Sequence, residues 1–224
     1  MTTPNTRLLL PEELILVALD DETGQLIDQP AIPLALDLAL AGALLMELAL
    51  AGRIDTDAQS LFAISPEPTG VALLDEVLAQ VVAQAQPHRS DWWLLHLSAN
   101  GRDYRKRLID MLVARGILMQ REKRLLWVFR QRVYPPSTGN EEREVRGRIT
   151  ELLQSQDIPE PHDALLVGLL ASTGLMTMLI SSEQEAGLRE RIDQLRNLEE
   201  ISRSLGNAIM NLHMALAEAA GLVH

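Results

Sequence analysis

The stretch AIPLALDLALAGALLMELALA, residues 31 to 51, decides the fold. It is apolar on nearly every helical face and carries only two charges, Asp37 and Glu47, which favours a helix in a protein core. A second run, ALLVGLLASTGLMTMLISS at residues 164 to 182, carries no charge. A membrane span is the alternative, but two carboxylates and Pro33 would be costly in lipid, and Ser, Thr and Gly weaken the second candidate. We predict two central helices of a soluble domain.

The composition favours helices packed on helices. Aromatic residues make up only 3% of the 224 residues, so Leu, Ala, Val and Ile must supply most of the buried area. Further helices are predicted at Pro11–Leu19, Val71–Gln84, Asp91–Leu97, Arg102–Arg115, Glu141–Ser155, Asp163–Ser182, Glu183–Arg196 and Asn197–Ala220. The predicted fold is mainly α: a single globular domain with a central apolar helix bundle, amphipathic outer helices and two β-hairpins.

Two segments with the same order of elements, a weak internal repeat, predict the two hairpins. The segments ELALAGRIDTDAQSLFAI from Glu47 and MLVARGILMQREKRLLWVF from Met111 each contain a helix, a Gly, and two short apolar strands around a polar turn. A winged helix has the same order of elements, so nucleic-acid binding is an alternative function at this point.

The sequence predicts no catalytic residue, metal site or cofactor, and hence no enzyme. It contains no P-loop, Rossmann glycine pattern, HExxH or GxSxG motif, and its five histidines are scattered without metal-ligand spacing. Asp37 and Glu47 are ten residues apart, about 280° around a helix, so they do not form a carboxylate pair on one face. Without cysteine or a secretory signal, the cytoplasm is the expected location. Of Trp92 and Trp93, one is expected in the core and the other at a surface.

Charge is unevenly distributed along the chain. The net charge of −11 argues against general nucleic-acid binding, yet Arg102–Arg132 contains ten basic and three acidic residues, a local charge of +7. Arg102 and Arg105 are three apart at the start of a predicted helix, where a phosphate would meet two guanidinium groups and unpaired backbone N–H groups. The alternative is that these arginines are solvated or pair with Asp103 and nearby acids.

The second hairpin, Gly116 to Tyr134, combines basic and large apolar residues. The letters RLLWVF follow the predicted polar turn REK, an arrangement that suits a membrane interface. The alternative is a strand whose alternate residues face the core, which periodicity favours for Trp127 and Phe129. The residues predicted to contact a membrane are Arg121, Lys123, Arg124, Leu125, Leu126 and Trp127, with Leu125 and Leu126 the expected exposed pair.

An ordered series of segments resembles the Golgi phosphoprotein 3 family. These segments are LLLPEELILVALDDETG, LAGALLMELALAGRI, LLDEVL, RDYRKRLIDMLVARGIL and HDALLVGLLASTGLMTMLI. The resemblance implies a mainly helical domain with a hairpin that dips into the membrane surface and a basic pocket that reads phosphatidylinositol 4-phosphate. Two pocket arginines of the family match Arg102 and Arg105, and its hairpin matches about Met119 to Val128.

Two other pocket positions of the family do not match. Ala41 stands where the family has an arginine, and no aromatic residue occurs near residues 27 to 29, where the family has a tryptophan. The basic N-terminal tail of eukaryotic members is missing too, and arginine greatly outnumbers lysine, so we expect a bacterial relative. Residues 1–6 are predicted to be a short tail and residues 7–224 the family domain.

We therefore predict a cytoplasmic adaptor, peripheral on the inner face of a membrane, that binds an anionic phospholipid headgroup. The predicted headgroup site is Arg102, Arg105 and Arg107. The alternatives are a soluble protein-interaction scaffold of the same fold that has lost phosphoinositide binding and, ranked lower, winged-helix DNA binding. Protein partners and a homo-oligomer are left open, and no nucleic acid is expected as a partner.

Overall fold

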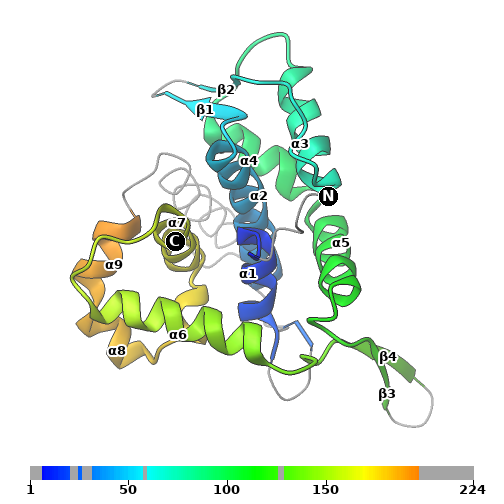
Figure 1. Cartoon of the computed structure of the whole chain (residues 1–224), viewed down its shortest axis with the longest axis vertical. Helices are drawn as coiled ribbons and strands as arrows, with labels where there is room; N and C mark the ends of the chain where they lie inside the picture. Colours follow the sequence, from blue (N-terminus) through cyan, green and yellow to red (C-terminus); the bar gives the residue numbers. More distant parts are fainter. Residues whose placement is uncertain (1–6, 21–24, 27–31, 58–59, 126–128, 197–224) are drawn as a thin grey trace, which may run out of the picture.

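The computed structural model describes residues 7–20, 25–26, 32–57, 60–125 and 129–196, and it arranges them mainly as helices (Figure 1). The helices are α1 (Leu10–Ala18), α2 (Ile32–Leu50), α3 (Ala72–Val82), α4 (Ser90–Ser98), α5 (Gly101–Ala114), α6 (Asn140–Gln154), α7 (Pro161–Thr173), the 3₁₀ helix η1 (Leu175–Met178), α8 (Ser182–Gly187) and α9 (Arg189–Arg196). Two antiparallel hairpins complete the single domain. The predicted fold class is confirmed.

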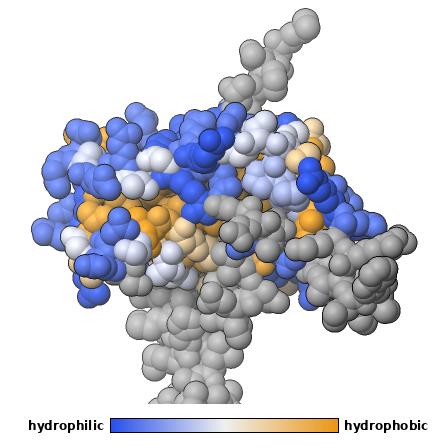
Figure 2. Space-filling view, turned by 90° about the horizontal axis from the view of Figure 1, so that it is seen from below, coloured by the Kyte–Doolittle hydropathy of each residue, from blue (hydrophilic) through white to orange (hydrophobic). Residues whose placement is uncertain are grey.

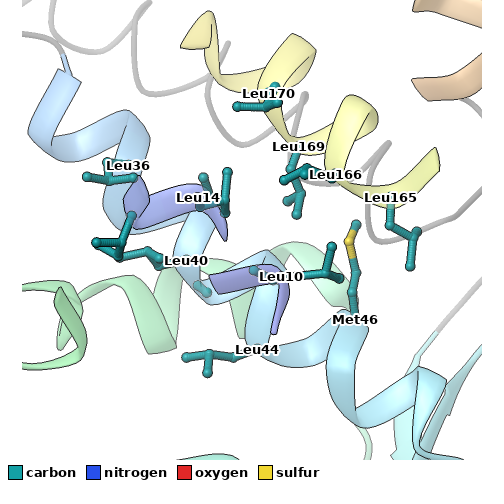
Figure 3. Close-up of a cluster of buried hydrophobic side chains, with 14 of the residues drawn as sticks. Leu10, Leu14, Leu36, Leu40, Leu44, Met46, Leu165, Leu166, Leu169 and Leu170 are labelled. Atoms are coloured by element: carbon teal, nitrogen blue, oxygen red, sulfur yellow. The ribbon is translucent and has the colours of Figure 1, made fainter. Parts of the chain in front are cut away.

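Helix α2 forms the centre of the core, with α1, α4, α5 and α7 packed around it (Figure 1). Its leucines meet those of α1 and α7; Leu14, Leu40 and Leu166 are each fully buried in this cluster (Figure 3). Apolar residues on nearly every face of α2 are explained by this position, since each face has a helical neighbour. Seen from below, hydrophobic residues gather in a patch on the left of this face, with hydrophilic residues around them (Figure 2).

Among the described residues, only α2 is long and apolar enough to cross a membrane, over the window Pro33–Leu50. Most of that window is buried inside the protein. This burial is what the predicted core helix requires.

The predicted helix over Asp163–Ser182 is wrong in its second half. Helix α7 ends at Thr173 because Gly174 adopts a left-handed conformation with φ of 72°, and a short 3₁₀ helix follows. The predicted helix over Glu183–Arg196 is likewise divided at Gly187 into α8 and α9. The predicted helix over Asn197–Ala220 lies outside the described residues.

Both hairpins follow a helix and a glycine, as the weak internal repeat in the sequence predicts. Strands β1 (Ile54–Thr56) and β2 (Leu61–Ala63) come after α2, and strands β3 (Arg121–Leu125) and β4 (Phe129–Val133) come after α5. The glycines between helix and hairpin, Gly52 and Gly116, have φ values of 64° and 74°. Such left-handed conformations are open to glycine at little cost, which is why each helix can stop there.

The turn of the second hairpin is not at REK, as the sequence suggested. Residues 121–123 belong to β3, and the strands pair from Arg121 opposite Val133 to Leu125 opposite Phe129. The connection therefore falls on residues 126–128, which lie outside the described residues and include the predicted membrane contacts Leu126 and Trp127. The side chains of residues 123–131 lie outside them as well. Figure 1 shows the hairpin projecting from the helical body, beyond the end of α5.

A network of buried charges joins α1 to its neighbours. Glu12 and Glu13 are both buried, and each meets an arginine: Glu12 Oε2 lies 2.6 Å from Arg115 Nη1, and Glu13 Oε1 lies 2.7 Å from Arg148 Nη2. These pairs attach α1 to α5 and to α6. A buried carboxylate without such a partner would be strongly unfavourable, so the pairs fix the two helices against α1.

His162 extends this network to α2 and α7. Its Nε2 lies 3.3 Å from Glu47 Oε1, and its Nδ1 lies 3.8 Å from Glu13 Oε2. Burial lowers the pKa of His162, but the carboxylates of Asp163, Glu47 and Glu13 outweigh that effect and leave the pKa raised. The imidazole therefore lies among carboxylates that favour its protonated form. Among the described residues, no group of histidine and acidic side chains has the arrangement of a metal site.

Candidate anion-binding site

The candidate site lies at the first turn of α5. The carbonyl oxygen of Asn100 accepts hydrogen bonds from the backbone N–H groups of Asp103 at 2.9 Å and Tyr104 at 3.1 Å, which begins the helix. Tyr104 and Leu108 are fully buried and hold the inner face of α5 against the core. The polar residues between them must then lie at the rim or outside, which fixes the direction of the first-turn arginines.

Helix α5 touches α2 at Gly101 and Asp37. A β-carbon at residue 101 would overlap the side chain of Asp37, so only glycine fits this point of contact. The Asp37 carboxylate consequently lies at the N-terminal end of α5, where the helix dipole favours a negative charge.

Both arginines of the predicted pair, Arg102 and Arg105, lie near the Asp37 carboxylate. Arg105 Nε lies 3.1 Å from Asp37 Oδ1, and the two side chains are only 17% and 16% exposed. Arg102 is exposed, and its charge also acts on Asp37. The site therefore has an inner arginine bound to an acid and an outer arginine that faces solvent.

Burial raises the pKa of Asp37, and the charges of Arg105 and Arg102 oppose that rise without cancelling it. An exposed aspartate beside two arginines would lose its charge less readily than Asp37 does, because burial disfavours the charged form of Asp37.

Arg107, the third residue of the predicted headgroup site, is directed elsewhere. Its Nη1 lies 2.8 Å from Glu76 Oε2 on α3 and 3.5 Å from Asp103 Oδ2. Residues two apart on a helix point to different sides, so Arg107 is separated from Arg105. The pKa of Arg107 is raised, chiefly by its hydrogen bond to Glu76. The structure brings together Arg102 and Arg105 but not Arg107.

Residue 41, where the family has an arginine, is an alanine inside the core. Ala41 is fully buried on α2, one helical turn after Asp37 and therefore on the same face. No charge is supplied from this position. Residues 27 to 29, where the resemblance placed a tryptophan, lie outside the described residues.

Sequence reasoning missed Asp37 and Gly101 as parts of this site. The available signal was that Asp37 is one of only two charges in a helix that is otherwise apolar, because a carboxylate in such a helix needs a basic partner. That Asp37 and Glu47 face different neighbours is confirmed: Asp37 meets α5, whereas Glu47 Oε1 accepts the backbone N–H of Leu10 on α1.

The tryptophan prediction is confirmed. Trp93 is buried in the core, while Trp92 is 37% exposed. The indole of Trp92 is stacked between two imidazoles, with ring centroids 3.9 Å from His88 and 4.7 Å from His96. These rings hold an exposed aromatic group in a fixed orientation on α4.

Comparison with known proteins agrees with the resemblance seen in the sequence. The model of the family described as Golgi phosphoprotein 3 (GPP34) matches residues 10–212. The chain belongs to this family. It is also similar to vacuolar protein sorting-associated protein 74 of Eremothecium gossypii, with 27% identity over 229 residues that cover 91% of this chain and 68% of the relative.

The Golgi phosphoprotein 3 membership bears on two of the expectations from sequence. Neither the family description nor the relative's name refers to a catalytic activity. The comparisons give no support to the expected bacterial origin.

Proposed function

We propose that this Golgi phosphoprotein 3 family member is a peripheral membrane adaptor that binds an anionic phospholipid headgroup through Arg102 and Arg105. The observation that carries the proposal is the presence of two guanidinium groups on the first turn of α5, one exposed and one at the rim of the core. Guanidinium N–H groups match phosphate oxygens in geometry and charge, and the end of a helix adds backbone dipoles of the same sign.

The second hairpin supplies the other half of the proposed contact. Strands β3 and β4 project from the helical body directly beyond α5 (Figure 1), and the sequence around their connection is rich in basic and apolar residues. Such a segment suits shallow insertion at the boundary between headgroups and acyl chains. A headgroup contact and a hairpin contact together would hold the protein on a membrane more firmly than either alone.

The term adaptor extends the proposal to protein partners. The similar protein from Eremothecium gossypii is named for its association with vacuolar protein sorting. The headgroup class favoured by the family resemblance is phosphatidylinositol 4-phosphate, although the buried Ala41 leaves the site with one cation fewer than the family pattern.

Liposome flotation tests the proposal. Phosphatidylcholine vesicles with and without phosphatidylinositol 4-phosphate are mixed with the wild-type protein, with Arg102→Ala/Arg105→Ala and with Arg143→Ala. Arg143 is an exposed arginine of α6 whose guanidinium hydrogen-bonds Gly139 O, so its loss removes one charge away from the site. Wild type and Arg143→Ala should float with the phosphoinositide vesicles, and the double variant should not. Equal, poor flotation of all three proteins on every anionic vesicle would instead favour the soluble scaffold.

A further inference from the structure

We infer that Asp37 is an intramolecular competitor for the anion, because its carboxylate holds Arg105 in the place of a ligand and thereby sets how tightly the site binds phosphate. This inference rests on the proposed function, since it concerns the same two arginines. It assigns a role to a residue of α2 that the arginine pattern of α5 does not contain.

The first support is the ion pair itself. Arg105 Nε, 3.1 Å from Asp37 Oδ1, is one of the N–H donors that a phosphate would use. A guanidinium offers its donors in a fixed fork, so a carboxylate on one edge removes that edge from recognition of a second anion. Because both side chains are largely buried, water weakens their attraction little.

The second support is the contact with Gly101. The Asp37 side chain fills the space that a β-carbon at residue 101 would need, which brings its negative charge to the N-terminal end of α5. A helix end attracts an anion through its dipole and its unpaired N–H groups. The charge of Asp37 already lies at this helix end, so it opposes the approach of a phosphate there.

The third support is the balance of charge. Arg102 and Arg105 are the cations of α5 whose charges act on Asp37, and Ala41, one turn along α2, adds none. Two cations and one carboxylate leave a net charge of +1 at the site. An incoming phosphate meets the exposed Arg102 first, and it reaches the Nε edge of Arg105 only by replacing Asp37. Burial raises the pKa of Asp37, so lowering the pH toward that pKa protonates the carboxylate and helps to release Arg105.

The experiment compares wild type, Asp37→Asn and Arg105→Ala for binding to phosphatidylcholine vesicles that contain phosphatidylinositol 4-phosphate, at neutral pH. Asparagine keeps the size of Asp37 but removes its charge. Asp37→Asn should bind about tenfold more tightly than wild type, because the ion pair that competes with the ligand for Arg105 is removed. Arg105→Ala should bind more weakly than wild type.

The outcomes separate the two ideas. If Arg105→Ala weakens binding but Asp37→Asn binds no more tightly than wild type, the competitor role is wrong while the proposed function stands. Weaker binding by Asp37→Asn would make Asp37 a residue that positions Arg105, which also overturns the inference. If none of the three proteins binds the vesicles, the proposed function fails and the inference falls with it.

A second measurement needs no variant of Asp37. Binding of inorganic sulfate, which keeps both its charges in mild acid, is measured for wild type and Arg105→Ala as the pH is lowered from neutral toward the pKa of Asp37. Sulfate binding by wild type should increase, because Asp37 releases Arg105 as it is protonated, and the increase should be absent in Arg105→Ala. Equal pH responses of the two proteins would overturn the inference.

Discussion

Gly101 packs so closely against Asp37 that a side chain of any size at residue 101 would overlap the aspartate. This contact sets the spacing between α2 and α5, and therefore the position of Arg105 against the core. The glycine is needed for space and not for an unusual backbone conformation, because residue 101 lies within a helix and has no positive φ.

Gly101→Ala should destabilise the protein by about 1–3 kcal/mol, the usual cost of forcing extra volume into a packed contact. The matched control is Gly147→Ala on α6, where a β-carbon would meet nothing within 4 Å. That control should instead stabilise the protein by about 0.5–1 kcal/mol, because alanine favours a helix more than glycine does. Urea unfolding of both variants checks the prediction, and effects of the same sign would contradict it.

Arg148→Ala should destabilise the protein by about 3–5 kcal/mol, because it removes the arginine that is hydrogen-bonded to the buried carboxylate of Glu13. Burial already raises the pKa of Glu13 even with Arg148 in place. Arg143→Ala, which removes an exposed arginine from the same helix, should cost less than about 1 kcal/mol. Chemical denaturation at neutral pH compares the two, and similar costs would mean that the Glu13–Arg148 pair contributes no more than a surface contact.

The raised pKa of His162 predicts how stability depends on pH. Because the folded protein holds the proton more tightly than the unfolded chain, this histidine contributes stability that is fully present below its ordinary pKa of 6.5 and is lost as pH rises through the raised value. The unfolding free energy of wild type should thus fall as the pH rises from the ordinary pKa of 6.5 through the raised pKa, and it should fall less in His162→Gln. Parallel curves for the two proteins would show that folding does not raise the pKa of His162.

Gly174→Ala should destabilise the protein by about 1 kcal/mol or more, because alanine would have to adopt the left-handed conformation that ends α7. Gly174→Asn should cost less, since asparagine enters that conformation more readily than other residues with a side chain. Thermal unfolding of the pair is the measurement. Alanine tolerated as well as asparagine would indicate that α7 can extend past Thr173.

The errors of the sequence predictions have physical causes. Apolar runs identified α2 and α7, because burial on all sides leaves an unmistakable pattern. The same pattern hid the end of α7, since apolar residues resume directly after Gly174 and Leu175 and Met176 are buried too. The turn at REK was misplaced because the sequence rule expects polar residues in turns, whereas strands that project from the body can be polar along their length.

The candidate site was predictable only in part. Arg102 and Arg105 share a helix, so their spacing in the sequence was enough to place them together. Their acidic neighbour Asp37 is far away in the chain and reaches them only because α2 packs on α5. Arg107 was assigned to the site by its closeness in sequence, whereas the contact of α5 with α3 gives it Glu76 as a partner.

The length of α5 restricts how a flat bilayer can approach this protein. Its 14 residues span about 21 Å, with Arg102 on the first turn and the hairpin β3–β4 beyond the last. A membrane plane that touches both must run alongside the axis of α5, and one that meets the helix end-on reaches only one of them. Docking with the axis of α5 alongside the membrane would leave the opposite side of the bundle, with α7 and α9, turned toward the solvent (Figure 1).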